Sequence, residues 1–202
     1  MNAFNATAYW TQRYHHGGTS GAGSYGRLAQ FKAAFVNDLI RREAIGSMID
    51  FGCGDGNQMS LFEVGTYLGV DVAPGAITRC RVRAAGDPSR QFCIASALPA
   101  SATADLALSM DVIFHLTDDD SFRLYMARLF ASAGRFVIIY ASNIDHQPVD
   151  IHVRHRRFTD HVAATEPDWR LCAHRINPYP FDPAQPDQTS FADFFVFRRV
   201  NG

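Results

Sequence analysis

The feature that most constrains this chain is a set of glycines at alternate positions directly after a short apolar strand. The segment reads Met48-Ile49-Asp50-Phe51-Gly52-Cys53-Gly54-Asp55-Gly56. Because glycine has no side chain, a ligand can approach the backbone of such a turn closely. We expect a brief helix to follow, whose exposed N–H groups attract a carboxylate or phosphate. The pattern therefore predicts a ligand-binding turn at the end of the first strand.

Strand and helix patterns alternate along most of the chain. Strands are predicted at 47–51, 67–72, 91–95, 104–109 and 135–140, and helices at 25–43, 74–85 and 118–131. Strands that alternate with helices favour an α/β fold, in which helices cover both faces of a mostly parallel sheet.

The end of the chain has a different pattern. A helix is predicted at 158–165, followed by strands at 169–176 and 190–200. Two consecutive strands joined by a loop predict an antiparallel hairpin that closes the sheet edge. We expect Trp169 to pack, and the hairpin core is expected to include Phe191, Phe194, Phe195 and Phe197.

Length, charge and cysteine content narrow the class of protein. The chain has 202 residues, 47% of them hydrophobic, which is enough for one domain with a full core. The net charge of -1 gives no electrostatic footprint for nucleic acid or a membrane surface. The four cysteines form no Cys-x-x-Cys pair, so neither disulfides nor a zinc site is expected. No signal peptide or membrane-spanning run is expected either, and a cytoplasmic location fits best.

The N-terminal segment combines aromatic residues with glycines. Residues 15–26 are rich in glycine and serine, and Tyr9, Trp10 and Tyr14 precede them. This composition is consistent with a linker, but a solvated tail is rarely so aromatic. We therefore predict that residues 1–24 form a lid or substrate segment over a single domain of residues 25–202, and that this lid excludes water from the site.

A carboxylate at the end of the second strand adds to the pattern. Asp71 lies in Gly69-Val70-Asp71-Val72 and can accept both hydroxyls of a ribose. As an isolated feature it is equally consistent with a helix cap. A dinucleotide site is the alternative for the glycine turn, but that site needs Gly-x-Gly-x-x-Gly, and here the third glycine comes one residue early.

Together, the turn, Asp71 and the segment Asp111-Val112-Ile113-Phe114-His115-Leu116 resemble the class I S-adenosylmethionine-dependent methyltransferase family. The resemblance implies a Rossmann-like, seven-stranded, mostly parallel sheet with a C-terminal antiparallel hairpin, and S-adenosyl-L-methionine as cofactor. It also implies that Asp50 holds the amino-acid end of the cofactor and that Asp71, beside Val72, holds the ribose. The other cofactor-binding residues that we expect are Tyr14, Gly18, Ser20, Gly52, Gly54, Gly56, Met110 and Asp111. Ser96 stands where the family often has an acidic residue against the adenine.

Two further segments resemble a bacterial subgroup of this family. They are the residues from Trp10 to Gly21 and from His152 to Phe158. A hydroxyl acceptor needs a base, and the candidates are His115, His146, His152 and Asp111. His115 is also consistent with a structural histidine, and the 143–157 segment with a metal site or a solvated basic loop. Arg154, Arg156 and His155 are expected to bind the substrate, with the arginines gripping a carboxylate or phosphate.

The leading hypothesis is therefore methyl transfer to a small molecule or glycan, at a hydroxyl group, with no nucleic-acid partner. Two alternatives remain open at this stage. One is a nicotinamide-dependent oxidoreductase, which lacks its usual turn here. The other is a non-catalytic domain that binds the cofactor.

Overall fold

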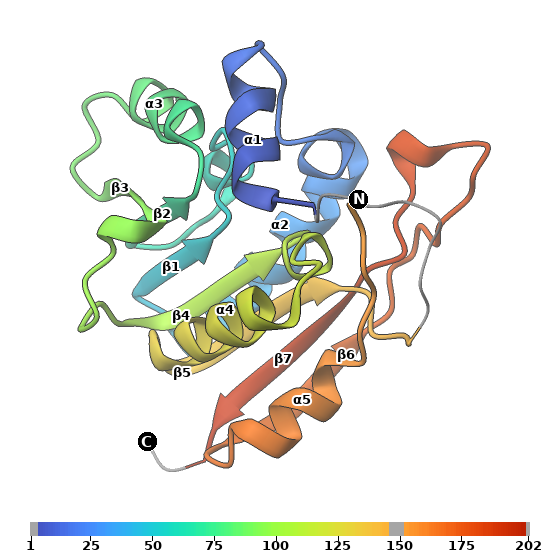
Figure 1. Cartoon of the computed structure of the whole chain (residues 1–202). Helices are drawn as coiled ribbons and strands as arrows, with labels where there is room; N and C mark the ends of the chain where they lie inside the picture. Colours follow the sequence, from blue (N-terminus) through green and yellow to red (C-terminus); the bar gives the residue numbers. More distant parts are fainter. Residues whose placement is uncertain (1–3, 146–151, 201–202) are drawn as a thin grey trace.

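The computed structural model describes residues 4–145 and 152–200 (Figure 1). They form one seven-stranded sheet with the order β3-β2-β1-β4-β5-β7-β6. Strands β1 to β5 pair in parallel, and β7 is antiparallel to both of its neighbours. The strands are β1 (Ser47–Phe51), β2 (Thr66–Asp71), β3 (Arg90–Ile94), β4 (Ala104–Met110), β5 (Ala133–Ala141), β6 (Trp169–Arg175) and β7 (Asp193–Arg199). The predicted fold class is confirmed.

Helices cover both faces of the sheet because successive strand side chains point to opposite faces. On one face, Leu106 and Leu108 of β4 pack in one cluster with helix α2 (Gly26–Glu43) and helix α3 (Pro74–Arg83). On the other, Ala107 packs in a second cluster with α4 (Asp119–Ala131) and α5 (Phe158–Thr165). In the view of Figure 1, α4 and α5 lie in front of the sheet and α2 lies behind it.

The prediction for the C-terminal hairpin is correct except at one residue. Trp169, Phe194, Phe195 and Phe197 are buried, as expected. Phe191 is 38% exposed and is not part of that core. It precedes β7, so the alternation of the strand does not direct its side chain inward; its ring packs against Phe114 and His155 instead.

The prediction of a brief helix after the glycine turn is wrong. Only a 3₁₀ turn, Met59–Leu61, follows β1. Gly52, Gly54 and Gly56 have φ angles of 84°, 58° and 76°, which are left-handed and incompatible with a right-handed helix. A turn of this length has no substantial dipole, so the expected anion site at a helix N-terminus does not exist here.

A helix that the sequence did not predict precedes the glycine-rich segment. It is α1 (Ala6–His15), and Asn5 caps it by accepting the N–H of Ala8 at 2.9 Å. Its last turn packs on α3 through Tyr14, Ala73 and Ala76. The chain then returns through a 3₁₀ turn, Ala22–Ser24, to α2. No helix in the described part of the chain is long and apolar enough to cross a membrane.

Candidate active site

A cavity of about 330 Å³ lies at the carboxyl ends of β1, β2 and β4. After β1 the chain continues to β2 toward one edge of the sheet, and after β4 it continues to β5 toward the other edge. Open α/β sheets bind ligands at such a switch point. The polar or small residues that line it include Tyr14, Ser20, Ser24, Gly52, Gly54, Gln58, Asp71, Asp111, His115 and Tyr125. Apolar contacts come from residues such as Trp10, Val72, Leu98, Met110, Val112 and Leu116.

Asp71 links the carboxyl ends of β1 and β2 at the floor of this cavity. Its Oδ2 accepts the backbone N–H of Gly54 at 3.0 Å, and its Oδ1 accepts that of Ala73 at 2.8 Å. Burial raises the pKa of Asp71, and these two hydrogen bonds oppose the rise. Each carboxylate oxygen has a second lone pair, so the group can still accept two hydroxyl donors from a ligand.

Glycine is required at two positions of the glycine turn, residues 52–56, which is called the bend below. A Cβ atom on Gly54 would collide with Ser20 Oγ and would lie 3.0 Å from the hydroxyl of Tyr14. A Cβ on Gly52 would collide with the side chain of Val112. Both residues also have positive φ angles, which glycine adopts without strain.

The N-terminal segment is fastened to this bend through Asp55. Its backbone N–H donates to Ser20 Oγ at 2.9 Å, and its Oδ2 accepts the Tyr25 hydroxyl at 2.5 Å and the Ser20 N–H at 3.2 Å. Burial works against ionisation, yet these hydrogen bonds lower the pKa of Asp55. On the other side, Arg79 donates to the carbonyls of Gly18 and Tyr14. The segment therefore forms a wall of the cavity.

Asp50 lies beneath the bend and does not line the cavity. It is buried, and its Oδ2 accepts the Tyr67 hydroxyl at 2.7 Å. Burial raises the pKa of Asp50 to about 7, while the Tyr67 hydrogen bond opposes the rise. The carboxyl group therefore titrates near neutral pH inside the core.

The rim after β4 carries a second carboxylate. Asp111 has a φ angle of 59°, a conformation uncommon outside glycine, and its N–H donates to the carbonyl of Tyr140 at 3.0 Å. Its Oδ2 accepts Lys32 Nζ at 2.6 Å. Non-glycine residues in this conformation persist where the surroundings hold them, often at functional sites.

His115 follows on the same rim and adjoins a second cavity of about 210 Å³. Its Nδ1–H donates to the His152 carbonyl at 3.0 Å, which makes Nε2 the basic nitrogen. The His152 ring stacks with the rings of His115 and Tyr9, and Trp10 meets His115 edge-on. The two cavities share Ala6, Thr7, His115, Leu116 and Ser121.

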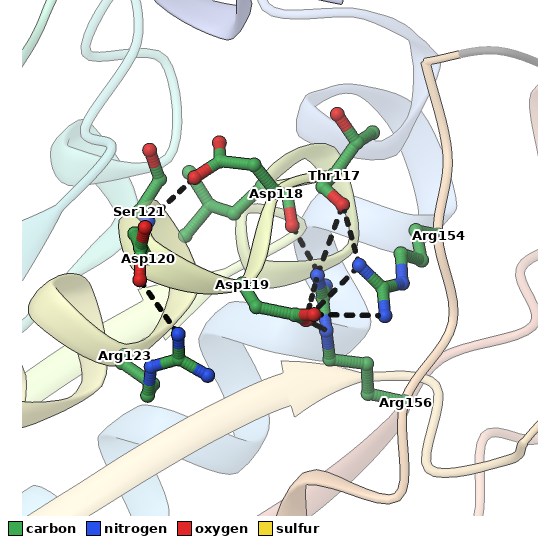
Figure 2. Close-up of polar contacts among 9 residues, drawn as sticks. Thr117, Asp118, Asp119, Asp120, Ser121, Arg123, Arg154 and Arg156 are labelled. Carbon is green, nitrogen blue, oxygen red and sulfur yellow. Dashed lines mark hydrogen bonds and ion pairs between the residues drawn. The ribbon is translucent and has the colours of Figure 1, made fainter. Parts of the chain in front are cut away.

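The predicted substrate residues of the 152–157 segment contact protein groups. Arg154 and Arg156 pair with Asp119 at 3.0 and 3.1 Å and donate to the Thr117 carbonyl (Figure 2). His155 is buried against Ser142, with 2.5 Å between Nδ1 and Oγ. None of Arg154, His155 and Arg156 lines either cavity. The arginines therefore fasten this segment to the start of α4.

We expect Arg156→Ala to lower the free energy of unfolding by about 1.5–3 kcal/mol, the range for hydrogen bonds to charged groups. Its guanidinium is largely buried and bonds Asp119 and the carbonyls of Leu116 and Thr117. Urea denaturation measures the effect, and Arg123→Ala, an exposed arginine of α4 paired with Asp120, is the matched control. Equal effects of the two substitutions would contradict the assigned clamp.

Comparison with known proteins finds a similar family for the central part of the chain. Residues 49–138 match the family model described as a methyltransferase domain. This match covers a little under half of the chain and includes the glycine turn and Asp71. No curated protein matches the sequence at a significant level.

Solved structures of S-adenosylmethionine-dependent methyltransferases share the fold of this chain at low sequence identity. The N-methyltransferase NodS from Bradyrhizobium japonicum WM9, in complex with S-adenosyl-L-homocysteine, has a TM-score of 0.72 and 12% identity, covering 96% of this chain and 99% of that one. Magnesium protoporphyrin IX methyltransferase from Synechocystis PCC 6803, with bound S-adenosylmethionine, has a TM-score of 0.68 and 13% identity, covering 98% and 100%. The mitomycin 7-O-methyltransferase MmcR has a TM-score of 0.61 and 16% identity, covering 85% and 52%.

The residues of the cavity fit such a cofactor. A bare backbone lies at Gly52 and Gly54, and Asp71 presents acceptors for ribose hydroxyls. Gln58 donates from Nε2 to Ser24 Oγ at 3.2 Å, and its buried Oε1 has no hydrogen-bond partner among residues 4–145 and 152–200. A buried acceptor in this condition needs a donor, and the ammonium group of the cofactor is one.

The structure places the predicted site residues in two groups. Those that line the main cavity are Tyr14, Ser20, Gly52, Gly54, Asp71, Val72, Met110, Asp111 and His115. Those that do not line it are Gly18, Asp50, Gly56, Ser96 and His152. At the position of Ser96 the lining comes from its neighbours Ala95 and Leu98. His146 lies outside the described residues.

Sequence reasoning missed Lys32, Gln58 and Trp10 as site residues. Lys32 carried a signal, because it falls four residues after Leu28 on the apolar stripe of α2, where a cation is out of place. Gln58 carried none, since only its long-range contact with Ser24 identifies it. In the described part of the chain, no group of three or more His, Cys, Asp or Glu side chains is arranged to hold a metal ion.

Proposed function

We propose that this chain transfers a methyl group from S-adenosylmethionine to a hydroxyl group of a neutral small molecule or glycan. The observation that carries the proposal is the second cavity, which joins the cofactor cavity at His115. When bound, the cofactor supplies a methyl group on a sulfonium. The protein must then align an acceptor with that group and receive the acceptor's proton.

The lining of the second cavity supports a neutral, polar acceptor. Apart from Asp118 and His115, its polar lining consists of the uncharged residues Asn5, Thr7, Thr117 and Ser121. Asp118 Oδ1 caps α4 by accepting the Ser121 N–H at 2.7 Å. The guanidiniums of Arg154 and Arg156 bind Asp119 rather than entering the cavity. An anionic acceptor would therefore meet a carboxylate and no arginine from this segment.

His115 is placed to act as the general base. It lines both cavities, and its Nδ1–H donates to the His152 carbonyl, so that Nε2 carries the lone pair. Trp10 meets its ring edge-on and His152 stacks on it, and these contacts restrict its orientation. Such an arrangement suits the abstraction of a proton from a hydroxyl during methyl transfer.

The test is a methyl-transfer screen with S-adenosylmethionine and paired acceptors, read by mass spectrometry. Each neutral sugar, polyol or phenol is offered beside its phosphorylated or carboxylated counterpart. We expect methylation of neutral acceptors, and His115→Asn should reduce the transfer rate by about 10²–10⁴-fold, with a much smaller effect on cofactor affinity. His174→Asn, a surface histidine paired with Asp193, is the control. Methylation confined to anionic acceptors, or full activity of His115→Asn, would contradict the proposal.

A further inference from the structure

Lys32 is the only lysine of the chain, since the other 18 of the 19 basic residues are arginines. Its side chain is 0% exposed, although lysine is among the residue types least often fully buried. It lies on α2, and Nζ donates to Asp111 Oδ2 at 2.6 Å and sits 5.2 Å from the centre of the Tyr140 ring. A buried lysine contributes nothing to solubility, so its position requires another explanation.

Stability does not supply that explanation. Replacing a buried ion pair by apolar residues is often neutral or stabilising, because the desolvation of both charges offsets their attraction. What the pair does provide is position. Asp111 is held from two sides, by Lys32 at its carboxylate and by the Tyr140 carbonyl at its backbone N–H. The Asp111 side chain is 25% exposed and lines the cofactor cavity, whereas Lys32 does not line it.

We propose that Lys32 is a positioning residue that holds Asp111 as the acceptor for the ammonium group of the cofactor's amino-acid end. This inference rests on the proposed use of S-adenosylmethionine. Lys32 binds Asp111 through Oδ2, and the other oxygen, Oδ1, can accept a further donor.

The neighbouring groups fit an ammonium group at this end of the cavity. Gly23 lies against the pair, since a Cβ there would be 3.0 Å from Asp111 Oδ2 and 3.8 Å from Lys32 Nζ. The next residue, Ser24, contacts Gln58, whose amide oxygen lacks a donor within the described part of the chain. Asp111 and Gln58 thus bring a charged and a neutral acceptor to the same end of the site. Asp71 lies at the end of β2, where we expect the ribose.

Three ligands separate this role from a structural one. They are S-adenosylhomocysteine, the aminopropyl thioether of adenosine, which keeps the ammonium and lacks the carboxylate, and methylthioadenosine, which lacks both. By calorimetry, Asp111→Asn should lower the affinity for S-adenosylhomocysteine and for the aminopropyl thioether about 10–100-fold, the range for a charged hydrogen bond. Methylthioadenosine should stay within about twofold, because distant contacts are independent.

A double-mutant cycle tests the part played by Lys32. Lys32→Met alone should weaken S-adenosylhomocysteine, but in the Asp111→Asn background it should change the affinity by no more than about twofold. The double variant replaces the pair by neutral groups of similar size and should stay folded even if the single variant does not. Because the chain has one lysine, selective ¹⁵N-lysine labelling gives one side-chain signal, which S-adenosylhomocysteine should shift and methylthioadenosine should not.

The outcomes distinguish the two proposals. If none of the three adenosine ligands binds the wild-type protein, the proposed function itself fails. If they bind and Asp111→Asn weakens S-adenosylhomocysteine and methylthioadenosine equally, the ammonium assignment is overturned while the function stands. That assignment is also overturned if only the ligand with a carboxylate responds, or if Lys32→Met weakens binding as strongly with Asn at position 111 as with Asp.

Discussion

Asp71→Ala is expected to weaken the binding of S-adenosylhomocysteine by about 100-fold or more, since a hydrogen bond to a charged group contributes about 1.5–3 kcal/mol and a ribose offers two. The substitution also removes the acceptor for the N–H groups of Gly54 and Ala73. The bend would therefore lose its tie to β2 at the same time. Isothermal titration calorimetry measures the affinity directly.

Two further variants make this result specific. Asp71→Asn retains one carbonyl acceptor and should fall between the wild type and Asp71→Ala. Asp120→Ala removes a carboxylate that is 95% exposed on α4 and should leave the affinity unchanged. An affinity of Asp71→Ala within about twofold of the wild type would be incompatible with a ribose held by this residue.

Asp50→Asn is expected to stabilise the protein at pH 8 by about 2–4 kcal/mol, because a pKa of about 7 lies about three units above the ordinary value and each unit corresponds to about 1.4 kcal/mol. A pKa that is raised in the folded state means that the folded state holds the proton more tightly than the unfolded state. The ionised carboxylate therefore destabilises the core above pH 7. Asparagine has no charge and can still accept the Tyr67 hydroxyl.

The pH dependence gives the sign of this effect. The Asp50 contribution makes wild-type stability increase as the pH falls from 8 through 7, and the increase levels off near pH 4, where unfolded aspartate also binds its proton. The advantage of Asp50→Asn should shrink over the same range. Urea denaturation at pH 8, 6.5 and 5 measures it, with the exposed Asp38→Asn as control. A destabilised Asp50→Asn at pH 8 would show that the buried carboxylate is favourably ionised.

The fold was predictable because its signals are local. Five of the strands coincide with short apolar runs, and the N-cap at Asp118 is readable from neighbouring residues. The same holds for the bend and Asp71, which lie at the ends of adjacent strands and meet at 3.0 Å. Parallel strands bring their carboxyl ends to one edge, so a sequence pattern alone places these groups together.

The errors arise where backbone conformation or distant contacts decide. The helix expected after the bend does not form because three glycines adopt left-handed φ angles, which a glycine pattern permits but does not by itself predict. Lys32 and Asp111 are 79 positions apart, and Arg156 and Asp119 are 37 apart. No local pattern links either pair. The lid assigned to residues 1–24 stays a prediction, although its contacts with Asp55 and Arg79 are consistent with a cover over the cofactor.

The most direct test of the cofactor site is a crystal structure with S-adenosylhomocysteine bound. We expect the ribose hydroxyls at about 2.5–3.0 Å from the Asp71 carboxylate, the usual range for O–H···O hydrogen bonds. We also expect the sulfur to face the rim formed by Met110, Asp111 and His115. A ligand bound elsewhere, or a ribose without contact to Asp71, would contradict the central claim that this bend and this carboxylate form the cofactor site.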